Sequence, residues 1–475
     1  MKFMQPLYHA RFYQAIILLW GVSVFYGICL TAHTPDPDTR RLPTGPRGSA
    51  AFGAYSTRLN DTPQWERQWP VSEVADVVVR FDDQEPRFVF WRGTSYIPCW
   101  ATYDGAWFTN EFFERRGGAE SGTVSMVEPM SDKQCRYSHV RILENTDARV
   151  VIHWRYAPTD LEYSMAFMDE ESHWGDWADE VYYLYPDAVG TRKATLFTSA
   201  PDEWIEYQES IVINPPGTMP DDNLSLAAVT LLNLQGDSRT FVWGEQGGPE
   251  FDHLPANVCI QRINLKTADK PFTIVPPDEV GIESYGGQAP GSHFNVWDHW
   301  PVSQVKSHTR VGTSAENPSH TSLSHLTWQP FAQDEQSKTW IMLHGMTEAD
   351  DNALVSLAKS WIQPPDLQLQ SDDFSYKGYD AAQRAFIVEC TKSDKPSSLN
   401  LKLSAGPEQP LVNPAFVIQG WGRSGVSIKK DGKTLENGNT VRVGHVSGAD
   451  GVDLIIWLCL QSDNPVTLQF SRITT

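Results

Sequence analysis

The strongest constraint on the fold of this chain is a series of short runs rich in β-branched and aromatic residues, each bounded by turn residues. Such runs form strands, and the Gly, Pro, Asn and Asp residues between them form turns. Helical periodicity is scarce, and its clearest example, 349–361, ends before Pro364 and Pro365. The expected strands of the first part of the chain are 74–81, 87–91, 139–143, 149–156, 181–185, 192–198, 225–233 and 240–243. The sequence therefore predicts an all-β protein built on an antiparallel meander.

A second group of short runs follows Pro365, at 385–390, 399–403, 415–419, 426–429, 441–444, 452–460 and 466–471. About seven strands in roughly 110 residues are typical of a β-sandwich, and a chain of 475 residues is too long for one ordinary core. We therefore expect a large antiparallel β-sandwich, of the super-sandwich kind, over residues 64–365, followed by a smaller C-terminal accessory β-sandwich over 366–475. No repeat period is visible in the sequence, which argues against a propeller or a β-helix.

The N-terminal segment reads as an export signal over residues 1–32. Its apolar run, 15–30, has 16 residues, which is short for a transmembrane helix of about 20 residues. We therefore expect cleavage near Ala32, a secreted or periplasmic protein and no stable membrane span. A lipid anchor at Cys29 is the weaker alternative, because the residues before it match that motif poorly. The Pro-, Arg-, Thr- and Gly-rich residues 33–63 are predicted to be a linker.

The charge balance restricts the partners. With 38 Lys and Arg against 59 Asp and Glu, the formal net charge is −21, which argues against nucleic acid as a partner. An anionic glycan remains compatible, since a local pocket of Arg and His can oppose the global field. The six cysteines show no metal-finger spacing, so we expect no zinc-ribbon site. We assign no metal ligand and no cofactor, and the sequence leaves the metal dependence open.

Histidine and tryptophan gather between residues 293 and 325, which hold five of the 13 histidines. Indoles stack on sugar rings, and imidazoles exchange protons near neutral pH, so this segment is typical of a carbohydrate-processing cleft. His299 lies between two indoles and is the preferred general base. The expected substrate-binding residues of the segment are Trp297, Trp300, Gln304 and His320. Buried core residues of a large β-protein are the structural alternative.

A second candidate constellation follows the expected strand 87–91. Arg92 can neutralise a sugar carboxylate through its guanidinium fork, and the Tyr96 hydroxyl can act as the acid partner of the base. Trp107 and Asn110, further along, are expected to bind substrate. We expect Arg92 and Tyr96 to approach the 293–325 segment in space, because separate loops commonly build one site. A structural Arg–carboxylate pair and a core tyrosine are the alternative.

The third candidate is the hairpin 139–156. Alternation buries Val150, Ile152 and Trp154 and sends His153 and Arg155 to the other face, where His153 is a candidate catalytic group and Arg155 a candidate substrate ligand. A three-residue loop at 145–147 gathers His139, Arg141, His153 and Arg155 on one polar face, whereas a two-residue loop separates them. The sequence leaves this register open. We expect His153 and Arg155 to line a groove, with a solvated polar surface as the alternative.

The choice of chemistry rests on residue types. The chain has neither a G-x-S-x-G elbow nor an H-E-x-x-H helix. Arg, His, Tyr and Asn suit β-elimination of a uronate-containing glycan, which needs a neutraliser, a base and an acid. Paired carboxylates for glycoside hydrolysis stay open, because several acidic residues have aromatic surroundings: Glu111, Glu114, Asp176, Asp179, Glu180 and Glu209.

Four strings of the sequence carry a resemblance to a known family. The residues at 90–98, at 149–156, at 177–180 with 185–190, and at 297–302 resemble the ulvan lyases of polysaccharide-lyase family forty, and the similarity covers most of residues 65–475. It implies a secreted β-rich enzyme that cleaves sulfated rhamnose–uronate chains by elimination, and it assigns no site residues. We therefore expect a secreted polysaccharide lyase acting on an acidic polysaccharide. A glycan-binding protein without chemistry and a glycoside hydrolase are the alternatives.

Overall fold

The computed structural model describes residues 42, 51–59, 74–102, 105–110, 112–204, 208–297, 300, 318–392 and 398–473. The regular structure is almost entirely β, as predicted, and the strands pair antiparallel apart from the parallel pair β21–β24. The described helical segments are short: η2 (Arg92–Thr94), η3 (Pro129–Ser131), η4 (Pro201–Glu203), α2 (Pro220–Asn223) and α3 (Asp351–Ile362). Within the described residues, no helix has both the length and the apolar character needed to cross a membrane.

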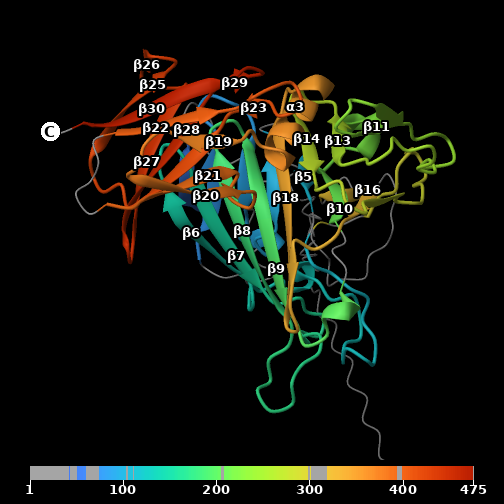
Figure 1. Cartoon of the computed structure of the whole chain (residues 1–475). Helices are drawn as coiled ribbons and strands as arrows, with labels where there is room; N and C mark the ends of the chain where they lie inside the picture. The colour runs from blue at the N-terminus through green and yellow to red at the C-terminus, as the bar shows by residue number, and fades with distance from the viewer. Residues whose placement is uncertain are drawn as a thin grey trace, which may run out of the picture. The chain divides into compact units, whose positions relative to one another are not determined.

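The first sheet of the large β-sandwich has eight strands (Figure 1). In spatial order they are β1 (Gly53–Thr57), β2 (Asp76–Arg80), β3 (Arg87–Phe90), β4 (Pro98–Ala101), β5 (Trp107–Thr109), β10 (Gln208–Asn214), β16 (Ser319–Thr327) and β15 (Gly281–Ser284). The strands β10 and β16 therefore lie side by side although more than 100 residues separate them, and their register pairs Ile213 with His320.

The second sheet has ten strands. Its main order is β12 (Ser238–Phe241), β11 (Leu224–Leu232), β13 (Ile260–Leu265), β14 (Lys270–Ile274), β18 (Ser337–Thr347), β9 (Val189–Phe197), β8 (Trp177–Tyr185), β7 (Val150–Tyr156) and β6 (His139–Asn145), with β17 (Ala332–Gln333) paired to β18. The two sheets meet through aromatic residues: the Phe88 and Tyr182 rings lie 5.3 Å apart, and the Trp100 indole donates to His344 Nδ1 at 3.0 Å. Burial of these large side chains is the main source of stability for such a sandwich.

The C-terminal part forms a second, smaller sandwich with its own core. One sheet holds β19 (Leu367–Leu369), β22 (Ser398–Leu403), β30 (Val466–Ile473), β25 (Gly425–Lys430) and β26 (Lys433–Leu435), and the other holds β20 (Phe374–Asp380), β21 (Ala385–Cys390), β24 (Ala415–Gln419), β28 (Gly451–Leu458) and β27 (Val441–Gly448). A further pair joins β23 (Leu411–Val412) to β29 (Gln461–Ser462). Rings of Phe386, Phe416 and Phe470 pack between the sheets at 5.3–5.5 Å.

The outer face of the ten-stranded sheet is covered at one end. The helix α3, which Asp350 caps by accepting from the Ala353 amide, buries Leu354 and Trp361 in one apolar cluster with residues of β9, β14 and β18. A second cluster joins Tyr185 of β8 to Trp457 of β28. The ion pair between Arg384 and Asp187 at 2.9 Å adds a polar contact between the sandwiches. The two sandwiches therefore share a buried interface at this end of the sheet.

The predicted linker 33–63 is wrong for its last part. Strand β1 lies within it and pairs with β2 from Gly53 opposite Arg80 to Thr57 opposite Asp76. Phe52 and Ala54 are buried, so this short stretch belongs to the sandwich as an edge strand of the sheet. The predicted signal peptide, residues 1–32, lies outside the described residues.

The hairpin β6–β7 settles the register that the sequence left open. Its turn is longer than either predicted loop, because Asn145 pairs with Val150, and a bulge follows between Ile142 and Glu144. Arg141 therefore lies opposite His153 and His139 opposite Arg155. The four polar residues share one face, and Val150, Ile152 and Trp154 are buried as predicted.

Candidate active site

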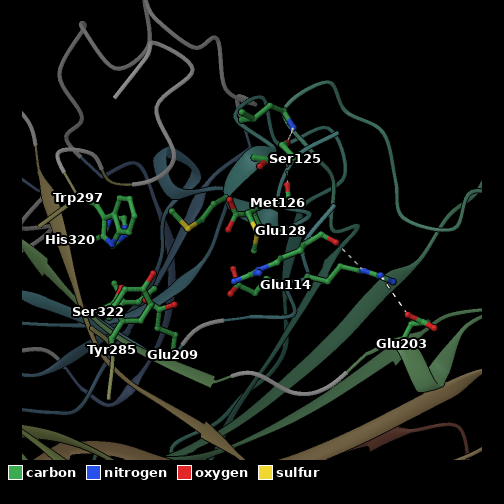
Figure 2. Close-up of a pocket in the computed structure, with 16 residues that line it drawn as sticks. Glu114, Ser125, Met126, Glu128, Glu203, Glu209, Tyr285, Trp297, His320 and Ser322 are labelled. Carbon is green, nitrogen blue, oxygen red and sulfur yellow. Dashed lines mark hydrogen bonds and ion pairs between the residues drawn. The ribbon is translucent and has the colours of Figure 1, made fainter. Parts of the chain in front are cut away.

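A pocket of about 700 Å³ opens beside the strands β10, β15 and β16. Figure 2 shows its polar side chains in three groups: Trp297 with His320 on one side, Glu114 with Glu128 on the other, and Tyr285 with Glu209 near Ser322. Apolar side chains fill part of the wall between them: Met126, Met130, Leu161 and Ile211. A pocket with apolar walls and a few convergent polar groups is the usual form of a ligand site.

The aromatic side of the pocket is built by the pairing of Trp297 with His320. Their backbones exchange two hydrogen bonds, at 2.9 and 3.0 Å, and their rings stack with centroids 6.1 Å apart. Trp297 is 36% exposed, whereas His320 is 7% exposed. Trp300 is buried and meets the His320 ring edge-on at 5.5 Å. An exposed indole over a fixed imidazole therefore offers a flat face to a sugar ring.

The opposite side carries a pair of carboxyl groups that hydrogen-bond to each other, Glu114 and Glu128. Burial and the neighbouring charge of Glu128 raise the pKa of Glu114 well above its usual range. Burial also raises the pKa of Glu128, to about 7, although the nearby Lys133 and the hydrogen bond from Glu114 oppose the rise. Like charges in one site cannot both ionise cheaply. The pair therefore holds a proton to a higher pH than an isolated carboxyl group does.

A third carboxyl group, Glu209, lies on β10 opposite His325 on β16. The Glu209 carboxylate and His325 Nε2 are 3.5 Å apart, and the Tyr285 ring lies edge-on to the His325 ring at 5.0 Å. Burial raises the pKa of Glu209, and His325 opposes this rise. Tyr285 is held by a backbone hydrogen bond to Leu323 at 2.9 Å. Tyr285 and Glu209 thus line the pocket, and the His325 imidazole contacts both of them.

Two consecutive arginines line the pocket and differ in their contacts. Arg115 lies over the Phe167 ring at 4.6 Å and the Trp204 ring at 5.6 Å, and it pairs with Glu203 at 3.8 Å. Arg116 is exposed, and its charge lowers the pKa of Glu114. Within the described part of the chain, no carboxylate lies at ion-pair distance from Arg116. Arg115 therefore supports the wall, and Arg116 is the arginine available to an anionic ligand.

The turn that contains Arg92 and Tyr96 does not reach the pocket. Arg92 is 1% exposed and donates from Nη1 to Asp76 at 2.7 Å, so its charge is already neutralised. Tyr96, with φ of 62°, is also buried, its hydroxyl donates to the Val74 carbonyl, and burial raises its pKa. These contacts make Arg92 a buried brace and Tyr96 a core residue, which was the structural alternative. The turn instead supports the pocket wall, because Ser95 donates to the carbonyl of Asp132 just after η3.

Two other predicted ligands belong to the core. Trp107 is 2% exposed and meets the Trp91 ring edge-on. Asn110 accepts hydrogen bonds from Gln208 at 3.0 Å and Thr273 at 2.6 Å, between the two sheets. Neither side chain lines the pocket. Their polar and aromatic character is used in packing.

His153 and Arg155 lie on the outer face of the ten-stranded sheet, away from the lining of the pocket. His153 Nε2 contacts Asp179 at 2.6 Å, and its Nδ1 accepts from Arg141 at 2.9 Å. Both ring nitrogens are therefore engaged, which leaves His153 no lone pair for a substrate proton. Of the other predicted residues, Trp297 and His320 line the pocket, Trp300 backs it, and His299 and Gln304 lie outside the described residues, where they stay predictions.

Several pocket residues were not singled out from the sequence, among them Arg116, Glu128 and Tyr285. Glu128 precedes Pro129 in a loop with no periodic pattern, and Tyr285 follows the short strand β15. Their partners are distant in the chain, so no local signal marks them. Among the described residues, no group of His, Cys, Asp and Glu is arranged to hold a metal ion.

Comparisons with known proteins give distant similarities. No family model matches the chain, and no curated protein matches it. Among solved structures, a mutant of the heparan sulfate lyase HepC from Pedobacter heparinus is 10% identical, with a TM-score of 0.24, over 76% of this chain and 41% of that one. A Paenibacillus xanthan lyase is 6% identical, with a TM-score of 0.25, over 90% and 38%. The chain spans about two fifths of the length of these solved chains.

Proposed function

We propose that the protein is a polysaccharide lyase that cleaves a uronate-containing glycan by β-elimination. The observation that carries this proposal is the hydrogen-bonded pair of Glu114 and Glu128, protonated near neutral pH and facing an exposed indole across the pocket. Two ionised carboxylates would repel a uronate. A pair that keeps a proton can instead donate a hydrogen bond to it, and Arg116 adds a positive charge.

Elimination needs three functions, and the pocket residues suit each of them. Glu128 and Arg116 would hold the uronate carboxylate and stabilise the negative charge that develops there, which makes the adjacent carbon more acidic. A base then removes the proton from that carbon, the electron pair forms a carbon–carbon double bond, and the glycosidic oxygen leaves with a proton from an acid. Tyr285 and His320 are the candidates for base and acid. His299, the base preferred from the sequence, follows Trp297 by two residues.

The sugar itself would be placed by the aromatic side of the pocket. Trp297 would stack on a ring next to the scissile bond, and Met126, Met130 and Leu161 would add apolar contacts to the sugar. The resemblance to ulvan lyases makes a sulfated rhamnose–uronate chain the first substrate to test. Export of the protein remains part of the proposal, since an enzyme for long glycans meets them outside the cell.

The test is ultraviolet absorbance of the unsaturated uronate during incubation of the purified protein with ulvan and a panel of other uronate polysaccharides. A rise in absorbance on at least one glycan is expected, and Tyr285→Phe should suppress it. The proposal fails if no glycan of the panel gives the absorbance although binding is detected, since that outcome indicates a glycan-binding protein.

A second candidate, a glycoside hydrolase, is favoured by one observation. Glu128 holds a proton near neutral pH and Glu209 lies in the same pocket, and hydrolysis uses one carboxyl as an acid and another as a base or nucleophile. Hydrolysis creates reducing ends without a double bond. New reducing ends at constant ultraviolet absorbance would therefore select this candidate.

A further inference from the structure

The outer face of the ten-stranded sheet carries a group of basic side chains in a chain of strongly negative charge. Alternation and register place them in rows that cross the strands β6 to β9 (Figure 1). One row runs Arg141, His153, Val181, Lys193, and the next runs His139, Arg155, Asp179, Thr195. We call these two rows, with Trp177 and Phe197 beside them, the basic face.

The charges of the basic face are unbalanced. Arg141, Arg155 and Lys193 are cations at neutral pH, and among the residues of the two rows Asp179 is the single carboxylate. Arg155, with a side chain 49% exposed, uses Asp179, whose pKa is lowered to about 2 by hydrogen bonds from His153 and Arg155 although burial opposes this. In the described structure, neither Arg141 nor Lys193 has a carboxylate partner at ion-pair distance. A net charge of −21 overall makes this local excess of positive charge a specific feature of the surface.

Several side chains of the basic face are held in position by their neighbours. His153 receives a hydrogen bond from Arg141 at 2.9 Å and contacts Asp179 at 2.6 Å, so one chain of contacts links Arg141 to Arg155. Trp177 and Phe197 stack with centroids 4.0 Å apart, and the Arg155 guanidinium lies 4.5 Å from the Trp177 ring. Less conformational entropy is lost when a ligand binds to side chains that are already fixed.

The basic face lies at one end of the ten-stranded sheet. The C-terminal sandwich covers the other end, at Tyr185. Arg141 and Lys193 lie three strand spacings apart, or about 14 Å between backbones, and the strands are about 4.8 Å apart. A ligand that reaches both Arg141 and Lys193 must therefore be extended and must carry repeated negative charges. A polyuronate chain has both properties.

We infer that the basic face is a second binding surface, distinct from the pocket, for an anionic polysaccharide chain. The inference rests on the proposed function for the class of glycan, but it requires no chemistry at this surface. His153 and Arg155, which the sequence had marked as site residues, are positioning residues in this inference, because their contacts with Arg141 and Asp179 hold the surface in place. A polyanion would form ion pairs with Arg141 and Lys193, which leaves the contact of Arg155 with Asp179 intact.

The test is the affinity of the full chain for polyglucuronate, measured by affinity electrophoresis or calorimetry in a Tyr285→Phe background that prevents cleavage. The double substitution Arg141→Gln with Lys193→Gln is compared with Arg423→Gln with Lys433→Gln, which removes the same charge from exposed positions of the C-terminal sandwich. We expect Kd to rise about fivefold or more for the first variant and less than about twofold for the control, with a weaker salt dependence in the first. Circular dichroism and Tm confirm that both variants fold.

The inference would be overturned if the two variants bound polyglucuronate with equal affinity. It would also be overturned if the first variant lost as much affinity for neutral dextran as for polyglucuronate. Tighter binding of a single-stranded oligonucleotide than of polyglucuronate would also overturn it, because the surface would then serve another class of polymer. Failure of the proposed function gives a different result. The protein with Tyr285 intact would release no unsaturated uronate, while the variant with Arg141→Gln and Lys193→Gln could still lose affinity for polyglucuronate.

Discussion

The most informative single substitution in this protein is Glu128→Gln. In the proposed lyase, Glu128 must be protonated to donate a hydrogen bond to the uronate, and its pKa is raised to about 7, mainly by burial. The protonated fraction falls from about nine tenths near pH 6 to about one tenth near pH 8, so kcat/KM of the parent should fall about tenfold over this interval. Glutamine donates a hydrogen bond at every pH. The variant should therefore lose this part of the pH dependence.

The size of the effect at low pH separates the candidate mechanisms. Exchange of one neutral hydrogen-bond donor for another costs about 0.5–1.5 kcal/mol, so near pH 6 the variant should retain activity within about tenfold of the parent. A hydrolase that used Glu128 as its general acid would lose about a hundredfold or more, because an amide has no proton to give. The assay is the initial rate of unsaturated product between pH 5 and 9, with Glu245→Gln, an exposed position outside the pocket lining, as the control. A folded variant that loses more than about a hundredfold near pH 6 would refute the neutralising role.

Tyr285→Phe should lower kcat by about a hundredfold or more and leave KM within about threefold, because the hydroxyl acts in proton transfer; rates at saturating glycan check this, and an unchanged kcat excludes Tyr285. Trp297→Ala should raise KM about three- to tenfold, from the loss of about 0.5–1.5 kcal/mol of stacking, and a KM equal to that of the parent would remove it from the binding site. Arg92→Ala should lower the free energy of unfolding by about 3–5 kcal/mol, because it leaves the buried Asp76 carboxylate without its cation. The kcat of the folded fraction should be unchanged. Denaturant titration measures the stability, and kcat per folded active site measures the activity. Burial lowers the pKa of His344 to about 3. Between that value and the unfolded pKa of about 6.5, the unfolded chain binds the extra proton, so stability decreases as the pH is lowered, by about 2 kcal/mol near pH 5. His344→Gln, which keeps an acceptor for the Trp100 indole, should flatten that acid limb in thermal melts, and an identical limb would place the acid sensitivity elsewhere.

The strands were predictable because their signal is local. The run 149–156 alternates over eight residues, and the structure buries Val150, Ile152 and Trp154 as that alternation requires. The helix α3 was predictable for the same reason, since its periodic face and the prolines after it lie within one short segment.

The pocket was only partly predictable, because its residues meet through strand pairing over long separations. Trp297 and His320 stood out as an indole and an imidazole in one segment, and both line the pocket. The sequence suggested Arg92 as a substrate ligand. Its partner, Asp76 on β2, lies 16 residues earlier in the chain, and no local pattern indicates that pairing. Nothing in the sequence around Glu128 indicates that burial will raise its pKa.

The shared interface between the sandwiches affects how this protein can be divided. Cutting the chain after residue 365 would uncover the Tyr185 end of β8, strip α3 of its contacts with Ala381 and Ala382, and leave Asp187 without Arg384. Apolar area exposed in this way promotes aggregation. The C-terminal sandwich is therefore not suited to transfer by itself as a fusion domain for other enzymes. Recombination at the boundary would have to exchange both contacting surfaces together.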